Sequence, residues 1–462
     1  MSAAASQLPL LAGHHADSVL AWRDGRPRTA ARYLADVLAF AARLPARGAA
    51  VNLCSDRYAF AVAFGAALLR GRTSLLPPNA RPETLAAVRA EHGALFVVAD
   101  DPETRVPGCE VLLLAIGDAS SPASLDPPAI DAALLAACLL TSGSTGTPQP
   151  HAKTWAQLHA NTRGGSARLA EMLGRPTMNG LTLVATVPPQ HSYGFESSLL
   201  LALHGGAAFH SGRPFYPADI VRALAEVPRP RALVTTPFHL KALLGAGLAL
   251  PPVDLVLSAT APLSPQLARE AERRFDGALI EIYGCTEAGQ VATRRTAAGE
   301  VWQTFGELRL RHEPAAADAQ ERFIVEGGHV LEPTPLADLL RLDDARHFML
   351  LGRANDLIHV AGRRSSLGHL NFHLNSIEGV QDGAFWLPDE VPDAVVRPVA
   401  FVVAPELSAQ AIAAGLRARL EAVFVPRRIV HVDALPREAT GKLTQGALRD
   451  FALAQLRHDG GH

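Results

Sequence analysis

Apolar residues in the N-terminal part of the chain form short runs separated by longer segments with helical spacing. Six short runs predict buried strands, at residues 49–53, 94–98, 136–140, 181–187, 232–236 and 255–258. Three longer segments predict helices, at residues 57–69, 82–91 and 154–173. Strands that alternate with helices favour a parallel sheet covered by helices, so we expect an α/β fold. Asp, Pro and Ser interrupt the pattern at residues 100–132 and predict a surface crossover there.

The character of the sequence changes near residue 353. Residues 353–364 are charged and rich in turn formers, and a smaller mixed segment follows them to about residue 455. A chain of 462 residues is also too long for one ordinary core. We therefore predict a large N-terminal domain of layered α/β subdomains, residues 1–352, and a small α+β C-terminal domain, residues 353–462.

Composition and charge narrow the class of protein. With 48% hydrophobic and 19% charged residues, the chain has the composition of a globular protein, and its net charge of −2 predicts no nucleic-acid surface. Four scattered cysteines without a C-x-x-C spacing suit a reducing compartment. No apolar run approaches the ~18 residues of a membrane span, and no cationic segment precedes an apolar one at the N-terminus. We expect a cytoplasmic protein.

A loop of glycines and hydroxylated residues follows the apolar run at 136–140. Its residues are Thr141, Ser142, Gly143, Ser144, Thr145 and Gly146. Glycines let backbone N–H groups converge on one point, hydroxyls add donors, and such a nest holds phosphate oxygens. The helix predicted from residue 154 would add a positive dipole end nearby. The spacing is not that of a Walker loop. An exposed Ser/Gly loop is the alternative interpretation.

With three further motifs, this loop resembles the adenylate-forming superfamily of acyl- and aryl-CoA synthetases, peptide-synthetase adenylation domains and firefly luciferase. The loop fits [ST]-S-G-[ST]-T-G-x-P-K-G, and residues 283–287 fit Y-G-x-T-E. A third motif has three parts: G-D is matched by Asp338, G-R-x-D-D by residues 351–356 and G-x-R by residues 362–364. The fourth, P-x-x-x-x-G-K, is matched by residues 436–442. Four matches in the family's order make coincidence a poor explanation.

The resemblance implies an enzyme that joins a carboxylate to the α-phosphate of ATP, releases pyrophosphate and uses Mg²⁺. Two anions ~4 Å apart repel each other by about 4 kcal/mol at an effective dielectric constant near 20, so the catalyst must supply positive charge and fixed donors. By resemblance, the loop cradles the β- and γ-phosphates and Lys442 reaches the carboxylate and the α-phosphate. Thr286 would bind the α-phosphate and Glu287 would hold Mg²⁺. The alternative for this pair is a helix N-cap with an acidic first turn.

The remaining nucleotide contacts follow from the same resemblance. Tyr283, with Gly284 beside it, would stack on adenine, Asp338 would accept hydrogen bonds from the ribose, and Arg353 would assist from the linker. The alternative for Asp338 is a surface-loop carboxylate, because Leu336-Ala337 replace the usual Thr-Gly before it.

The acid would bind beyond the carboxyl ends of the strands, where ligands sit in open α/β sheets. The expected pocket residues are His191, Phe238, Ser258, Ala259 and Gly284. A structural histidine is the alternative for His191. His369 and His373 have the spacing of helical metal ligands, but no third ligand is evident.

Three departures from the family pattern concern the second half-reaction. Gln149 replaces the usual loop lysine, although Lys153 follows four residues later, and His359 stands where a lysine is frequent. Asn355 takes the position of the hinge aspartate about which the mobile C-terminal domain rotates. In the second pose, the loop around Gly362 would shape a tunnel for a pantetheine thiol. These departures concern the acceptor rather than the activation step.

The compact length and the segment Pro188-Pro189-Gln190-His191-Ser192-Tyr193-Gly194 look like the stand-alone aryl acid ligases of aryl-polyene and xanthomonadin-type pigment pathways. We therefore expect activation of an aryl acid such as 4-hydroxybenzoate and its transfer to an acyl carrier protein. Arg427-Arg428 would face that acidic partner or the phosphates of CoA, or form a solvated turn. Alternatives are a short- or medium-chain or aryl acyl-CoA synthetase, a catalytically inactive nucleotide-binding protein and a simple NTPase.

Overall fold

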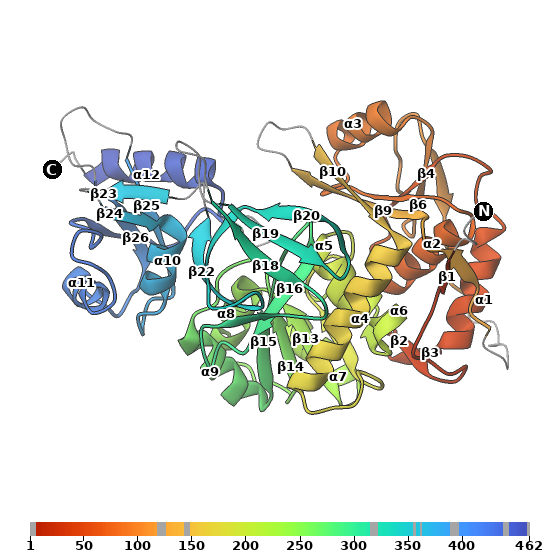
Figure 1. The fold of residues 1–462 in the computed structure, drawn as a ribbon, viewed down its shortest axis with the longest axis horizontal. Helices are drawn as coiled ribbons and strands as arrows, with labels where there is room; N and C mark the ends of the chain where they lie inside the picture. The colour runs from red at the N-terminus through yellow and green to blue at the C-terminus, as the bar shows by residue number, and fades with distance from the viewer. Residues whose placement is uncertain are drawn as a thin grey trace.

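The computed structural model describes residues 6–117, 126–142, 148–314, 322–353, 357–360, 363–388, 397–437 and 443–459. Two large sheets and four smaller sheets of two or three strands organise these residues (Figure 1). Strands and helices alternate along much of the chain, so the predicted α/β fold class is confirmed.

The first sheet has six strands in the order β10-β9-β5-β4-β6-β7. Their bounds are β4 Ala49–Asn52, β5 Ser74–Leu76, β6 Leu95–Ala99, β7 Glu110–Leu113, β9 Leu135–Ser142 and β10 Pro148–Thr154. All neighbours pair in parallel except β10, which is antiparallel to β9. The accompanying helices are α1 Ala30–Ala41, α2 Arg57–Leu69 and α3 Pro82–His92. Here the crossover prediction for residues 100–132 is wrong in part, because this segment contains β7 as an edge strand and β8 Ala129–Asp131, which pairs with β1 Gln7–Pro9.

The second sheet has eleven strands in the order β21-β22-β17-β16-β15-β14-β13-β11-β12-β2-β3. Its parallel centre consists of β2 Val19–Arg23, β11 Thr182–Ala185, β12 Ala208–His210, β13 Arg231–Thr235, β14 Leu255–Ser258 and β15 Ala278–Cys285. Its antiparallel flanks are β3 Arg26–Thr29, β16 Gly289–Arg294, β17 Trp302–Thr304, β21 Asp338–Leu342 and β22 His347–Arg353. Successive residues of β14 face opposite layers: Leu255 and Leu257 join one hydrophobic cluster and Val256 joins the other. This alternation explains why the central strands are nearly continuous apolar runs.

Helices cover both faces of the second sheet (Figure 1). They are α4 Trp155–Met172, α5 Ser192–Gly194, the π-helix η1 Phe195–Leu200, α6 Leu201–Gly205, α7 Pro217–Glu226, α8 Pro237–Gly245 and α9 Pro265–Phe275. Local caps explain where two of the predicted helices begin. Asp56 Oδ1 accepts a hydrogen bond from the Ala59 N–H at 2.8 Å to cap α2, and Thr154 forms a capping box with Gln157 at the start of α4.

The C-terminal part lies at one end of the molecule, drawn in blue in Figure 1. It contains β23 Leu357–Val360, β24 Arg363–Ser366, α10 Leu367–Asn375, β25 Asp382–Trp386, β26 Val399–Val403, α11 Ala409–Arg417, β27 Ile429–His431 and α12 Gln445–Asp459. A separate meander, β18 Arg309–Glu313, β19 Arg322–Gly327 and β20 Val330–Leu336, precedes it along the chain. Ser366 Oγ donates to the Leu351 carbonyl at 2.9 Å, and Gln266 Nε2 donates to the Ser376 carbonyl at 2.5 Å, so hydrogen bonds join the two parts.

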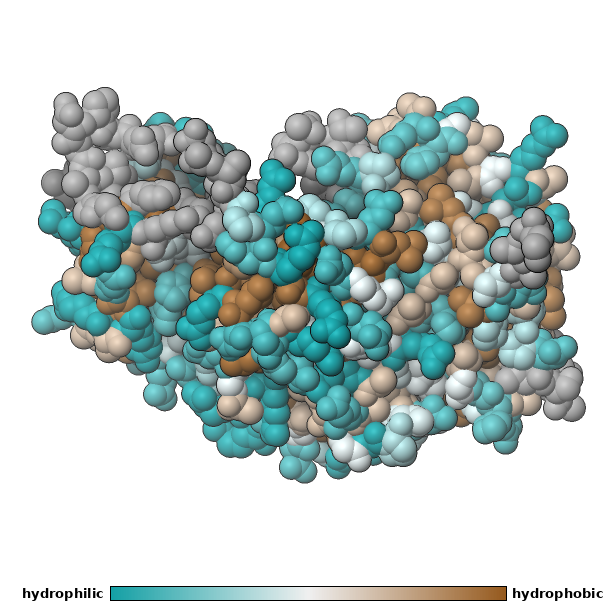
Figure 2. Space-filling view, in the orientation of Figure 1, coloured by the Kyte–Doolittle hydropathy of each residue, from teal (hydrophilic) through white to brown (hydrophobic). Residues whose placement is uncertain are grey.

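Hydrophilic side chains cover much of the face shown in Figure 2, where hydrophobic residues form small patches. Within the described part of the chain, no helix combines the length and the apolar character that a membrane crossing requires.

A buried arginine joins the first helical layer to the second sheet. Arg57, at the start of α2, is 1% exposed, and its guanidinium donates to Ser198 Oγ at 2.6 Å and to the Val187 carbonyl at 2.8 Å. Burial lowers the pKa of Arg57 to about 9, and Arg213 adds to this effect. Val187 immediately precedes the Pro188-Pro189 break, so this contact fixes the chain where it enters the predicted acid pocket.

We predict that Arg57→Met destabilises the protein by about 2–4 kcal/mol, because it leaves buried carbonyls without a donor. The exposed Arg70, at the other end of α2, supplies the matched control, and Arg70→Met should change stability by less than ~0.5 kcal/mol. Urea unfolding followed by circular dichroism measures both. Equal midpoints for the two variants would contradict the structural role of Arg57.

Candidate active site

The glycine-rich loop connects the two strands of a β-hairpin. Ser142, at the end of β9, pairs with Pro148 at the start of β10. Thr141 is the preceding residue of β9, whereas Gly143, Ser144, Thr145 and Gly146 lie outside the described residues. Helix α4 begins only after β10, at the opposite end of the hairpin, where Thr154 pairs with Leu135. Seven strand residues span roughly 20 Å, so the prediction of a helix dipole beside the loop is wrong.

A second turn carries Thr286 and Glu287. β15 ends at Cys285, residues 286–288 form a turn, and β16 begins at Gly289. A side chain at Gly284 would approach the Gly289 carbonyl oxygen to 2.3 Å, and Gly289 has a φ of +83°, so this tight hairpin needs both glycines. The alternative of a helix N-cap for Thr286 and Glu287 is therefore wrong. The side chain of Glu287 is exposed at the turn.

The structure brings Tyr283, Asp338 and Arg353 together. Tyr283 Oη donates to Asp338 Oδ2 at 2.8 Å, and the tyrosine ring packs on Trp302 and Phe348 with centroid distances of 5.8 and 5.6 Å. Asp338 begins β21 and pairs in register with Arg353, the last residue of β22. The surface-loop alternative for Asp338 is wrong, because this carboxylate belongs to a strand and is bound by a nearly buried tyrosine.

The predicted acid-pocket residues follow the carboxyl ends of neighbouring parallel strands. His191 lies after β11 and immediately before α5, Phe238 is the second residue of α8 after β13, and Ser258 ends β14 with Ala259 next to it. These strands and β15, which carries Gly284, are adjacent in the sheet, so the residues share one edge. Burial lowers the pKa of His191, and the charge of Arg213 lowers it further.

Two buried polar atoms near this edge lack partners. Ser258 is fully buried, and its Oγ has no hydrogen-bond partner among the described residues. His239, one residue after Phe238, shares Nδ1 with Thr236 Oγ1 at 3.0 Å, but its Nε2 also lacks a partner in the described part of the chain. Sequence reasoning missed His239, although its place beside Phe238 after a strand end is a usable signal.

A buried polar network that sequence reasoning also missed lies against the Thr286–Glu287 turn. Lys153 is 6% exposed, and its Nζ donates to the main-chain carbonyl of Glu287. Glu196 is 4% exposed and accepts hydrogen bonds from Asn161 Nδ2 and Ser192 Oγ, each at 2.9 Å. Glu196 is the one acidic residue within the apolar run of η1 and α6, and this was the signal available in the sequence.

Burial and neighbouring charges set the protonation of this network. Burial lowers the pKa of Lys153, while Glu196, Cys285 and Glu287 oppose that effect. Burial raises the pKa of Glu196, while the Asn161 hydrogen bond and the Lys153 charge oppose it. His329, on the other side of the turn, has a pKa of about 4 because of burial and the nearby charge of Lys153. His329 and Glu287 line a small pocket of about 210 Å³.

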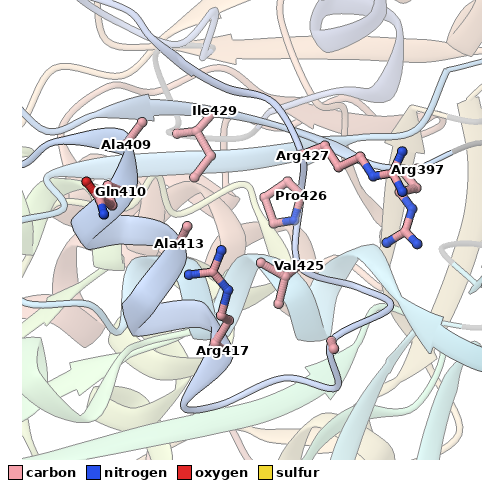
Figure 3. Close-up of a pocket in the computed structure, with 10 residues that line it drawn as sticks. Arg397, Ala409, Gln410, Ala413, Arg417, Val425, Pro426, Arg427 and Ile429 are labelled. Carbon is pink, nitrogen blue, oxygen red and sulfur yellow. The ribbon is translucent and has the colours of Figure 1, made fainter.

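A larger pocket of about 470 Å³ lies in the C-terminal part, far along the chain from these motifs (Figure 3). Its basic lining residues are Arg397, Arg417 and Arg427. Arg417 extends from α11 towards the segment that contains Val425 and Pro426 (Figure 3). The pocket suits an anionic group.

Several predicted residues remain without a structural description. Asn355, Gly362 and Lys442 lie outside the described residues, as does most of the glycine-rich loop. The His369 and His373 rings are 4.4 Å apart on α10, but the described residues contain no cluster of three His, Cys, Asp or Glu side chains that suits a metal. Mg²⁺ needs only one or two carboxylates together with substrate phosphates and water, and the exposed Glu287 carboxylate fits that requirement.

A solved structure shares this fold. The structure is similar to that of ATP-bound MatB from Rhodopseudomonas palustris, with a TM-score of 0.75 and 20% identity over 94% of this chain and 96% of that chain. The similarity covers nearly all of both chains, so both share a large α/β region and a smaller C-terminal region.

Residues 11–316 match the AMP-binding enzyme family, and residues 374–442 match the AMP-binding enzyme C-terminal domain. The chain therefore belongs to the AMP-binding enzyme family. It is 30% identical to a 4-coumarate–CoA ligase of Rhodobacter capsulatus over 65% of this chain and 73% of the relative. A 4-coumarate–CoA ligase of Halorhodospira halophila is also 30% identical, over 66% and 73%. The predicted superfamily and its use of ATP with Mg²⁺ to activate an acid are confirmed.

The depressed pKa of His329 predicts a pH-dependent stability. The unfolded chain binds a proton at this residue below pH ~6.5, but the folded protein does so only near pH 4. Stability from neutral His329 is therefore complete above pH ~6.5 and is lost as the pH falls towards 4, with a slope of up to ~1.4 kcal/mol per pH unit. His329→Gln should flatten the fall of the melting temperature between pH 6.5 and 4.5. The exposed His15 supplies the control His15→Gln, which should keep the wild-type slope. Parallel curves for all three proteins would refute the assignment.

Proposed function

We propose that this enzyme activates an aryl acid such as 4-hydroxybenzoate to an aryl-adenylate and transfers the aryl group to the pantetheine thiol of an acyl carrier protein. The observation that carries the choice of acid is the pair of buried polar atoms, Ser258 Oγ and His239 Nε2, beside the aromatic Phe238. An aliphatic chain would leave both atoms unsatisfied at a cost of about 1–3 kcal/mol each, whereas a phenolic hydroxyl can bind them. The 4-coumarate–CoA ligases among the relatives support an aryl acid of this kind.

The narrower proposal is a stand-alone ligase of the aryl-polyene or xanthomonadin type. Its support is the Pro188–Gly194 segment, in which Tyr193 is partly buried and Arg57 fixes the preceding carbonyl. In this proposal His191, Phe238, Ser258, Ala259 and Gly284 form the pocket wall. Activity with fatty acids in place of benzoates would refute it.

We assign the nucleotide contacts as the motifs suggest. Thr141, Ser142 and the adjoining glycine-rich loop hold the β- and γ-phosphates, and Thr286 binds the α-phosphate. Tyr283 stacks on adenine, while Asp338, oriented by the Tyr283 hydroxyl, and Arg353 hold the ribose. Glu287 holds Mg²⁺, which supplies positive charge next to the phosphates. These contacts place the acid carboxylate and ATP in one cleft, so their reaction becomes effectively unimolecular.

Lys442 is the proposed catalytic residue. Residues 353–462 form the lid domain that carries it, residues 1–352 form the ATP- and acid-binding domain, and Asn355 is the hinge between the two poses. The compact ammonium of Lys442 neutralises the carboxylate and the α-phosphate oxygens as they approach. In the second pose, Gly362 lines the tunnel for the thiol.

A second candidate acceptor is CoA, as in an aryl or short- to medium-chain acyl-CoA synthetase. The names of the 4-coumarate–CoA ligases favour it. The pocket with Arg397, Arg417 and Arg427 supports either acceptor, because an acidic carrier protein and the CoA phosphates both present negative charge.

The activation step is tested by ATP–pyrophosphate exchange with a panel of benzoates and fatty acids. Exchange should depend on an added hydroxybenzoate, and Lys442→Ala should lower it by about three orders of magnitude while ATP still binds. Arg457→Ala, in exposed α12, is the control and should retain wild-type exchange. Unchanged exchange in Lys442→Ala would refute the catalytic assignment, and phosphate release without any acid would favour a simple NTPase.

The acceptor is tested with purified adenylate-loaded enzyme, CoA and a carrier protein. Arg417→Glu combined with Arg427→Glu should slow transfer to the true acceptor by about tenfold, because both charges are reversed, and leave exchange within twofold of wild type. The neighbouring exposed Arg419 supplies the control Arg419→Glu. Transfer to CoA but not to the carrier protein would contradict the carrier protein as the acceptor and would favour CoA.

A further inference from the structure

Lysine is rare in this chain, which makes the position of each one informative. Lys153, Lys241 and Lys442 are the only lysines among 43 basic residues. The other 40 are arginines, whose planar guanidinium is larger than the compact ammonium of lysine.

Strand β10 carries three side chains on one face, and two of them lie near the Thr286–Glu287 turn. Gln149, His151 and Lys153 alternate along the strand and so share one face. Exposure decreases along this face, from exposed Gln149 through partly exposed His151 to buried Lys153. Charge interactions with Glu287 affect the pKa of both His151 and Lys153, so both lie near the turn.

Lys153 contacts the main chain of the turn rather than the Glu287 side chain. Its Nζ donates to the Glu287 carbonyl, and the Glu287 carboxylate is exposed beside this contact. On the opposite side, a Cβ at Gly289 would lie 3.0 Å from Asn161 Nδ2 and 3.4 Å from His329 Nε2. The turn is thus held between Lys153, Asn161 and His329.

Glu196 supplies the counter-charge that makes a buried lysine tolerable. It opposes the effect of burial on the pKa of Lys153 more than any other residue. Hydrogen bonds from Asn161 and Ser192 fix both of its carboxylate oxygens. An uncompensated buried charge is strongly destabilising, so a buried lysine and a buried glutamate persist together only where the pair has a structural or functional use.

We propose that Lys153 is a positioning residue for the metal-binding turn. It fixes the Glu287 main chain so that the Glu287 carboxylate meets Mg²⁺ bound to the ATP phosphates. Glu196 neutralises the charge of Lys153. This inference rests on the proposed role of Glu287. Residues that orient a metal ligand typically change metal affinity by about 10–100-fold when they are removed. Lys153 also joins β10, the second strand of the glycine-rich hairpin, to the turn.

The test compares Lys153→Met, Glu196→Gln and the double variant Lys153→Met/Glu196→Gln. Methionine keeps much of the lysine stem but removes the donor, and glutamine removes the counter-charge. Calorimetric titration with ATP in the presence of Mg²⁺ or of EDTA gives a readout that does not require turnover. Melting temperatures report whether each variant folds.

Lys153→Met should weaken binding of Mg–ATP by about tenfold and binding of metal-free ATP by less than twofold. Its melting temperature should fall, because Glu196 loses its counter-charge. The double variant should recover most of the melting temperature but keep the weak Mg–ATP binding, and Glu196→Gln alone should bind Mg–ATP within about threefold of wild type.

Wild-type Mg–ATP affinity in the double variant would overturn the proposal, because Lys153 would then serve only as the partner of Glu196. If ATP binding weakened equally in the presence and in the absence of Mg²⁺, the proposal would also be overturned. Failure of the wild-type protein to exchange pyrophosphate with any acid tested would refute the proposed function instead, and the Mg–ATP titration would still decide the role of Lys153.

Discussion

The hydrogen bond from Lys153 to the Glu287 carbonyl joins the two sheets on which the candidate site is built. Lys153 belongs to the edge of the six-stranded sheet, and Glu287 follows the last parallel strand at the centre of the eleven-stranded sheet. Burial lowers the pKa of Lys153, and the negative charge of Glu196 opposes that effect. A polar network of this kind is costly when it is incomplete, so it constrains the geometry more strongly than apolar packing alone.

Much of the fold could be predicted because local signals agree with the tertiary structure. Helix α2 has the predicted bounds, since Asp56 caps it and an apolar segment follows, and β14 also has the predicted bounds. The path from the loop to α4 could not be predicted. Residues 148–154 form an antiparallel strand because their partner is the adjacent β9, and no local preference shows that pairing. For the same reason β7 was missed: it is a short edge strand in a polar segment.

The candidate site likewise contains residues that the sequence could predict and residues that it could not. The motifs indicated Tyr283, Asp338 and Arg353, and the structure brings them together, but the hydrogen bond that orients Asp338 depends on two strands at opposite sides of β16, β17 and β22. Lys153, Asn161, Glu196 and His329 carry no motif, and only the three-dimensional arrangement shows that they surround one turn. The roles of Lys442, Asn355 and Gly362 stay predictions.

Under the proposed function, the unpartnered atoms of the acid pocket explain how a common fold can select its acid. A pocket that is only hydrophobic distinguishes a substrate from its analogue weakly, whereas one that contains buried hydrogen-bonding groups rejects an analogue without the matching group by several orders of magnitude. Ser258 Oγ and His239 Nε2 are such groups, and the burial-depressed pKa of His239 keeps the imidazole neutral at physiological pH. A neutral imidazole nitrogen can accept a hydrogen bond from a phenol, which an imidazolium cannot do. Under the proposed function, selection for a hydroxylated ring depends on the same burial that leaves these atoms without partners among the described residues.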